Sequence, residues 1–194
     1  MDKVRFGLSN CKYAIYDEAQ GTYGDPVAMP GAVSLSLTRE GGDSSDYYAD
    51  NGVYYTFAGT NGGYSAALEM ARITPEQRAA LLGEILDTAK KMYVEVTDPE
   101  DIQFALICQY EGNQNPIAQV FYNCKASRIE TSANTLNDSP DVDSDTLNLR
   151  IAAQNFTFKG VQRGCVQAYM EKTTENATEF AAFLAAVQLP TETA

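Results

Sequence analysis

Apolar and polar residues alternate with a period of two along much of this chain, which restricts the folds that it can adopt. The alternation is clearest over residues 33–38, 102–110 and 147–153. Because neighbouring side chains on a strand point to opposite faces, each segment predicts a strand with one apolar and one polar face. We therefore expect a chain built mainly from half-buried antiparallel strands.

The apolar phase shifts by one residue after Ala153, where Phe156 and Phe158 continue the pattern. A one-residue slip would turn the strand inside out, so we expect a β-bulge near Gln154 and Asn155. Further segments have the alternating, β-branched or aromatic residues that are typical of strands. These strand candidates are Tyr13–Tyr16, Val53–Phe57, Ser65–Ala71, Met92–Val96, Ile117–Asn123 and Cys165–Met170.

One internal segment has the start signal and the spacing of an α-helix. Thr74 can cap the helix, Pro75 stands at its first position, and Gln77 completes a capping box. The apolar stripe that follows at helical spacing consists of Leu82, Ile85, Leu86 and Ala89. We therefore expect a helix whose apolar stripe reaches Ala89.

A second helix is expected at the C-terminal end, over residues 175–190. Asn176 can cap it, apolar residues recur from Phe180 to Val187, and Pro190 ends it. A mainly β chain with these two helices predicts a β-sandwich or barrel of antiparallel strands with the helices packed on it. The chain has 194 residues, no internal repeat and no Pro-rich linker, so we expect a single domain over residues 1–194.

Composition excludes several classes of function. The chain contains no histidine, which removes Ser-His-Asp triads, Cys-His dyads and HExxH zinc sites. Its formal net charge is −12, so we do not expect a nucleic-acid binder, which needs a basic face for the phosphates. No run of 18 apolar residues occurs, and we therefore expect no membrane span.

The cysteines indicate a reducing compartment. They have no CxxC spacing, and the N-terminal Met1–Arg5 does not lead into the apolar run of a signal peptide. We expect four free thiols that act as small buried apolar groups, at Cys11, Cys108, Cys124 and Cys165.

No segment carries a complete catalytic, cofactor or metal motif. Residues 141–145 begin like a calcium loop, but Thr146 stands where Gly is needed and Ala152 stands where a bidentate Glu is needed. Glu100 and Asp101 are adjacent acids in a turn, where carboxylates usually face solvent. The glycine motifs that bind phosphate are also missing, so we expect no catalytic residue, no cofactor, no metal site and no enzyme.

The unusual segment of the chain is residues 41–64, which is rich in Tyr, Gly, Asp and Asn and contains no Lys or Arg. Tyr is favoured at contact surfaces because it offers apolar area and a hydroxyl with little conformational entropy to lose. Two interpretations are open: the tyrosines pack on their own sheet, or they contact another subunit. The residues of the expected assembly contact are Tyr47, Tyr48, Asp50, Tyr54, Tyr55 and Tyr64.

Several short stretches of the chain have counterparts in a known protein family. They are Val4–Leu8, Lys12–Tyr16, Tyr23–Val27, Pro30–Leu35, Tyr47–Asn51, Asn61–Tyr64, the capped segment from Thr74, and Phe180–Pro190. In these stretches the chain resembles the phi13-type major tail proteins of long-tailed phages. The resemblance is sharpest over residues 4–86 and 180–190, and it is looser over residues 90–172.

The resemblance implies a structural tail-tube protein with no active site and no cofactor. Such a protein is a β-sandwich with a flanking helix, and it forms hexameric rings that stack into the hollow tail tube through which the phage genome passes. Its expected partners are other copies of itself and the tape measure, tail terminator and baseplate-side proteins. The DNA would pass without specific binding, which the negative charge of the chain favours.

The resemblance also implies a place in the cell and a role for the Tyr-rich segment. The protein would be assembled in the cytoplasm of a host bacterium and would end in the tail of the virion. Residues 41–64 would make the axial contact between rings, because a Gly-rich segment is costly to order unless a partner buries its rings.

Two other classes remain open. One is a tube protein of a related contractile or secretion-type injection machine, which would share the fold and carry another cargo. The other is a soluble enzyme or binding module on a β-sandwich, which a well-formed pocket with convergent polar groups would favour.

Overall fold

The computed structural model describes residues 4–112, 115–131 and 143–190. The two helices are α1 (Pro75–Leu82) and α2 (Ala177–Ala185). The strands of the first half are β1 (Arg5–Asp17), β2 (Thr22–Tyr23), β3 (Val27–Ala28), β4 (Ala32–Glu40), β5 (Ser45–Ala49), β6 (Gly52–Phe57), β7 (Gly63–Met70), β8 (Ile85–Asp87) and β9 (Met92–Val94). The strands of the second half are β10 (Phe104–Gly112), β11 (Ile117–Ala126), β12 (Asp145–Ile151), β13 (Gln154–Phe158), β14 (Val161–Cys165) and β15 (Gln167–Glu171).

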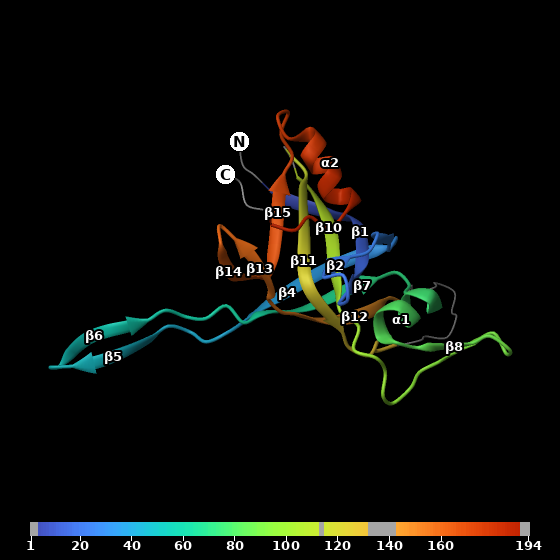
Figure 1. Ribbon diagram of the computed structural model, residues 1–194, viewed down its shortest axis with the longest axis horizontal. Helices are drawn as coiled ribbons and strands as arrows, with labels where there is room; N and C mark the ends of the chain where they lie inside the picture. The colour runs from blue at the N-terminus through green and yellow to red at the C-terminus, as the bar shows by residue number, and fades with distance from the viewer. Residues whose placement is uncertain (1–3, 113–114, 132–142, 191–194) are drawn as a thin grey trace, which may run out of the picture.

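One antiparallel sheet forms the body of the molecule. Its strand order is β2-β1-β10-β11-β12-β7-β4, with β15 paired to β11 and β3 paired to β1. Strands β10, β11 and β15 run side by side, and β4, β7 and β12 cross them at one end, so that the sheet wraps around a core (Figure 1). Three further hairpins, β5–β6, β8–β9 and β13–β14, lie outside this sheet. The prediction of a mainly antiparallel β fold with one internal and one C-terminal helix is confirmed.

The central strand β10 is buried on both faces. Leu106 and Cys108 lie in the main core, between the two parts of the sheet. Ala105 and Ile107 face the opposite way, into a second apolar cluster with Phe180 of α2. The alternating pattern predicted only a half-buried strand here, and it is wrong for the second face because small and β-branched residues lie there under α2.

Helix α1 begins as predicted but ends early. The Oγ1 of Thr74 accepts a hydrogen bond from Gln77 N at 3.3 Å, and Gln77 Oε1 accepts one from Thr74 N at 2.9 Å. Gly83 ends the helix with φ 72°, and its N–H donates to Ala79 O at 3.1 Å. The expected continuation to Ala89 is wrong, because the chain reverses there and forms the β8–β9 hairpin instead.

The phase slip after Ala153 has a different cause from the expected bulge. Strand β12 ends at Ile151, and Ala152 N donates to Asn123 O at 3.2 Å outside the strand ladder. Strand β13 then begins a separate hairpin with β14, so the slip is a break between two strands. Helix α2 covers residues 177–185 of the range expected for it.

Candidate assembly surfaces

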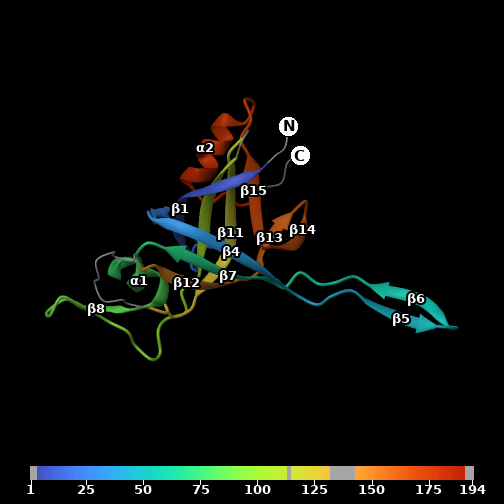
Figure 2. The same ribbon diagram turned by 180° about the vertical axis from the view of Figure 1, so that it is seen from behind.

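The Tyr-rich segment forms a hairpin that projects from the body. Strands β5 and β6 pair with each other beyond the ends of β4 and β7, and they lie at one end of the long axis of the molecule (Figures 1 and 2). At ~3.3 Å per residue, the arm from Gly41 to Asp50 is about 30 Å long. Asp50 and Asn51 close it with φ of 51° and 60°, as a two-residue type I′ turn requires.

Glycines let the two strands cross closely at the neck of this hairpin. A Cβ on Gly41 would lie 1.9 Å from Thr60 O, and one on Gly59 would lie 2.7 Å from Gly42 O. Thr60 N donates to Gly42 O at 2.9 Å across the same neck. The glycines of this segment are therefore required by close backbone approach as well as by backbone freedom.

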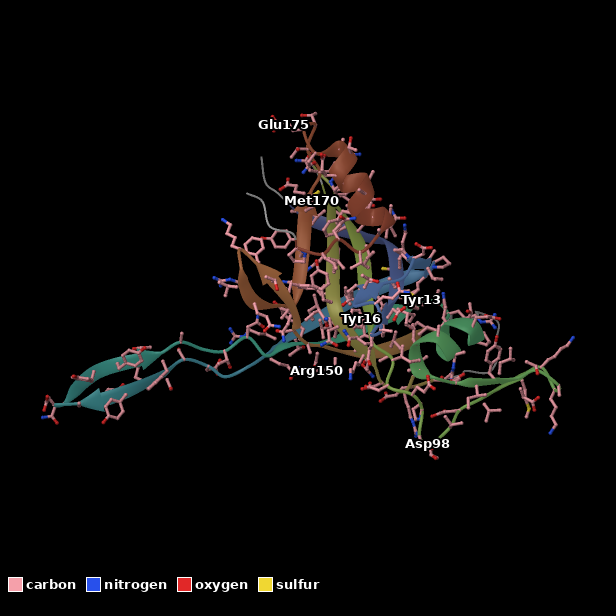
Figure 3. All side chains as sticks on the ribbon, in the orientation of Figure 1. Tyr13, Tyr16, Asp98, Arg150, Met170 and Glu175 are labelled. Carbon is pink, nitrogen blue, oxygen red and sulfur yellow. The ribbon has the colours of Figure 1, made fainter. Side chains whose placement is uncertain are left out.

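Arg150 of β12 fastens the neck to the body. Its Nη2 donates to Gly62 O at 2.9 Å, and its Nη1 forms an ion pair with Glu40. Figure 3 labels Arg150 at the point where the two neck strands leave the sheet. The base of the hairpin is therefore tied to the core sheet, whereas its strands contact each other.

The aromatic side chains of the hairpin are exposed. The exposed fractions of Tyr47, Tyr48, Tyr54 and Tyr55 are 58%, 67%, 73% and 58%. Tyr47 and Tyr54 are in edge contact at 6.5 Å between ring centroids, and Tyr55 and Phe57 are in edge contact at 4.9 Å. The rings therefore contact each other and leave most of their area open to a partner.

Tyr64 lies apart from the other predicted contact residues. It is in β7, half-buried against the main core, and its hydroxyl oxygen accepts a hydrogen bond from Gln167 Nε2 at 3.4 Å. Asp50 is at the tip of the hairpin, next to the exposed rings. The hairpin thus brings together five of the six predicted residues and leaves Tyr64 at its base.

The hairpin is acidic as well as aromatic. Asp43 pairs with Arg39 at 3.0 Å on an exposed surface, and Asp46 Oδ1 accepts from Thr56 Oγ1 at 2.7 Å. Asp50 adds a third carboxylate at the tip. No Lys or Arg occurs between Arg39 and Arg72, so Asp46 and Asp50 have no basic residue within the segment.

A second exposed apolar hairpin is formed by β8 and β9. The sequence predicted a strand over Met92–Val96, where β9 lies, but it placed the residues of β8 in the preceding helix, so the hairpin was missed. Ile85, Leu86, Met92 and Val94 are 57%, 44%, 44% and 37% exposed. The signals that could have identified it are Gly83, which favours a helix end, and the turn-forming Asp87 between two apolar triplets.

The buried cysteines have no arrangement for catalysis. Cys11 Sγ donates to Cys108 Sγ at 3.3 Å, and both thiols are buried between β1 and β10. The hydrogen bond with Cys11, together with burial, raises the pKa of the Cys108 thiol well above its usual value. Burial raises the pKa of Cys124 to about 12. The thiols of Cys108 and Cys124 are therefore protonated near neutral pH, whereas a nucleophilic cysteine must be a thiolate. The hydrogen bond with Cys108 lowers the pKa of Cys11, and burial acts in the opposite direction.

A pocket beside α1 already has its charges paired. Arg78 Nη2 lies 2.7 Å from Glu84 Oε1, and Arg128 Nε lies 2.9 Å from Glu95 Oε1, along its wall. Within residues 4–112, 115–131 and 143–190, no three His, Cys, Asp or Glu side chains are placed to hold a metal ion. In the same ranges no helix is long and apolar enough to cross a membrane. Residues 141 and 142, the first two of the calcium-like segment, lie outside the described ranges.

Comparison with known proteins gives similarity at the level of the fold. No family model and no curated protein matches the chain. One similar solved structure is the sheath–tube complex of PVC, an extracellular contractile injection system, in its extended state; identity is 12%, 84% of this chain and 88% of that chain are covered, and the TM-score is 0.42. Two others come from the anti-feeding prophage (AFP). A chain of the AFP baseplate is 12% identical, with 84% of this chain and 91% of that chain covered and a TM-score of 0.46. A chain of the AFP tube-terminating cap is 12% identical, with 87% of this chain and 94% of that chain covered and a TM-score of 0.45.

Proposed function

We propose that this chain is a structural subunit that polymerises into a hollow tube, as stacked hexameric rings through which a cargo passes. The observation that carries the proposal is the β5–β6 hairpin. It projects from the body and carries four tyrosines that are each more than half exposed, and Arg150 is hydrogen-bonded to its base. Rings buried in a contact pocket contribute roughly 1–3 kcal/mol each, so such an arm is suited to hold a neighbouring subunit.

The charge of the chain supports a passive role toward nucleic acid. A net charge of −12 removes the release of counterions that holds most proteins on DNA. A tube with this composition would let DNA slide without specific binding. Its further partners would be the tape measure, tail terminator and baseplate-side proteins, and assembly would take place in a bacterial cytoplasm before the particle is released.

Two kinds of machine would use such a subunit. The resemblance of the sequence favours the tail of a long-tailed phage. The solved structures named above come from contractile injection systems, and they agree better with the alternative, a tube of an injection machine with another cargo. A gene for a sheath protein beside the gene of this chain would favour the contractile machine.

Negative-stain microscopy of the purified protein over a range of concentrations and salt tests the proposal. We expect rings or tubes under at least one condition, alone or with a tail-initiating partner. A protein that remains monomeric in all of these conditions would contradict it. A gel-shift titration with duplex DNA at low salt should show no tight complex.

A further inference from the structure

The β8–β9 hairpin has an exposed and largely apolar face. Ile85 is paired with Val94 and Asp87 with Met92, so these four side chains share one face of the hairpin. Tyr93 lies on the opposite face and is hydrogen-bonded to the Glu76 carboxylate in the first turn of α1. Tyr93 therefore faces α1, whereas Ile85, Met92 and Val94 on the other face of the hairpin are exposed.

The turn of this hairpin is fixed and basic. The Oδ1 of Asp87 accepts hydrogen bonds from Ala89 N at 2.9 Å and from Lys90 N at 3.0 Å. Lys91 completes the turn with φ 54°. Both lysines are exposed, and neither forms an ion pair with any other residue in the described ranges. In a chain with 26 acidic and 14 basic residues, this tip is a local site of positive charge.

The two exposed hairpins are complementary. The β5–β6 hairpin carries aromatic rings and the carboxylates of Asp46 and Asp50, which form no ion pair within the described ranges, whereas the β8–β9 hairpin carries aliphatic side chains, two lysines and one carboxylate, Asp87. They lie at opposite ends of the long axis of the molecule (Figures 1 and 2). They therefore cannot meet within one subunit, but the arm of one copy can reach the far end of the next.

We infer that the β8–β9 hairpin is the docking site for the β5–β6 hairpin of a second copy of this chain. Tyr47, Tyr55 and Phe57, which share one face of the arm, pack on the face of Ile85, Met92 and Val94, while Asp50 at the tip of the arm lies near Lys90 and Lys91. The inference rests on the proposed function, because it names the surface that receives the assembly arm. A contact between two different surfaces at opposite ends is head-to-tail, so it adds subunits in one direction and does not stop at a dimer.

The rings of the arm supply part of the area that such a contact needs. A large aromatic side chain buries about 150–250 Å² when it is covered. Tyr47, Tyr55 and Phe57 are 55–58% exposed, so these three rings can still supply roughly 250–430 Å², about a third to a half of the ~800 Å² per partner that a stable interface needs. The lysines at the rim would add direction and specificity more than affinity.

Cross-linking tests the contact directly. A 1:1 mixture of ¹⁴N and ¹⁵N protein is treated with a water-soluble carbodiimide, which joins an amine to a carboxylate that it touches. We expect mixed-isotope peptides that join Lys90 or Lys91 to Asp50. The variant Lys90→Glu/Lys91→Glu should lose them, whereas Lys159→Glu should keep them. Lys159 is a matched control, because it is also an exposed lysine at a hairpin turn with positive φ, of 50°.

A reciprocal charge exchange gives the second test. Lys90→Glu/Lys91→Glu and Asp50→Lys should each raise the concentration needed for assembly by about tenfold or more, because like charges then face each other. A mixture of the two variants should assemble near the wild-type concentration, since each hairpin again finds its opposite charge on the other copy.

The outcomes separate this inference from the proposed function. Tubes without the cross-links, or tubes unaffected by the exchange, would overturn the inference and leave the tube function standing. Cross-links in a protein that forms no ring or tube would support the contact and overturn the function. A wild-type protein that gives neither cross-links nor assembly would overturn both.

Discussion

Removing the four tyrosines of the hairpin tests whether they act between subunits or within one. The variant Tyr47→Ser/Tyr48→Ser/Tyr54→Ser/Tyr55→Ser replaces rings that are 58–73% exposed in the single chain. Exposed substitutions usually change the free energy of unfolding by less than ~0.5 kcal/mol each. The body should therefore unfold at nearly the wild-type urea midpoint, with the same far-ultraviolet circular dichroism.

Assembly of the same variant should fail. If each lost ring removes only ~1 kcal/mol from a contact, four rings raise the critical concentration for assembly by about a thousandfold. Sedimentation of polymer across a concentration series measures this shift. Tyr169→Ser is the matched control, because Tyr169 is 72% exposed on β15, outside the hairpin. Normal polymerisation of the four-residue variant would refute the role of the rings.

Four further changes have defined outcomes. Thr74→Ala removes the bond that Thr74 Oγ1 accepts from Gln77 N, and it should lower the free energy of unfolding by about 1 kcal/mol in a urea titration. Gly63→Ala places a Cβ 2.0 Å from Ile151 O at φ 92° and should lower the melting temperature, whereas Gly52→Ala, with no atom within 4 Å, should not. Timed alkylation at pH 8, followed by mass spectrometry, should modify Cys165 first, because its thiol is partly exposed. Cys124 should react last, because its pKa is raised to about 12 and appreciable thiolate forms only as the pH rises toward that value. Raising the salt from about 10 mM to about 150 mM should promote stacking, because it screens the repulsion between subunits of charge −12.

The strands were predictable because their pattern depends on burial of one face. Residues 33–38 and 147–151 alternate, and both became strands that line the main core. The second buried face of β10 was not predictable, because Ala105 and Ile107 depend on a helix that lies about 75 residues later in the chain. A local pattern carries no information on which distant element covers a strand.

The hairpin after α1 was missed for a different reason. Leu82, Ile85 and Leu86 have spacing that suits one face of a helix, and they also suit a helix end followed by a short strand. The hairpin forms instead of a longer helix because Gly83 adopts a left-handed backbone that ends α1, and because Ile85 pairs with Val94. The composition of residues 41–64 marked them as an unusual segment. The projection of their hairpin was not predictable, because it depends on the contact of Arg150 with Gly62 and on the close approach of the glycines at the neck.

The energetics of the β5–β6 hairpin favour a partner. A two-stranded hairpin is marginally stable in water, and it usually needs a third strand or a packed face. The β8–β9 hairpin has the bond from Tyr93 to α1, and β13–β14 has Phe156, which contacts the Tyr122 ring at 5.1 Å between centroids. The β5–β6 hairpin has its type I′ turn, its two ring contacts and its neck. The rings of this hairpin already lie in ordered pairs. The arm would therefore lose less conformational entropy on binding a neighbouring subunit than a flexible loop would lose.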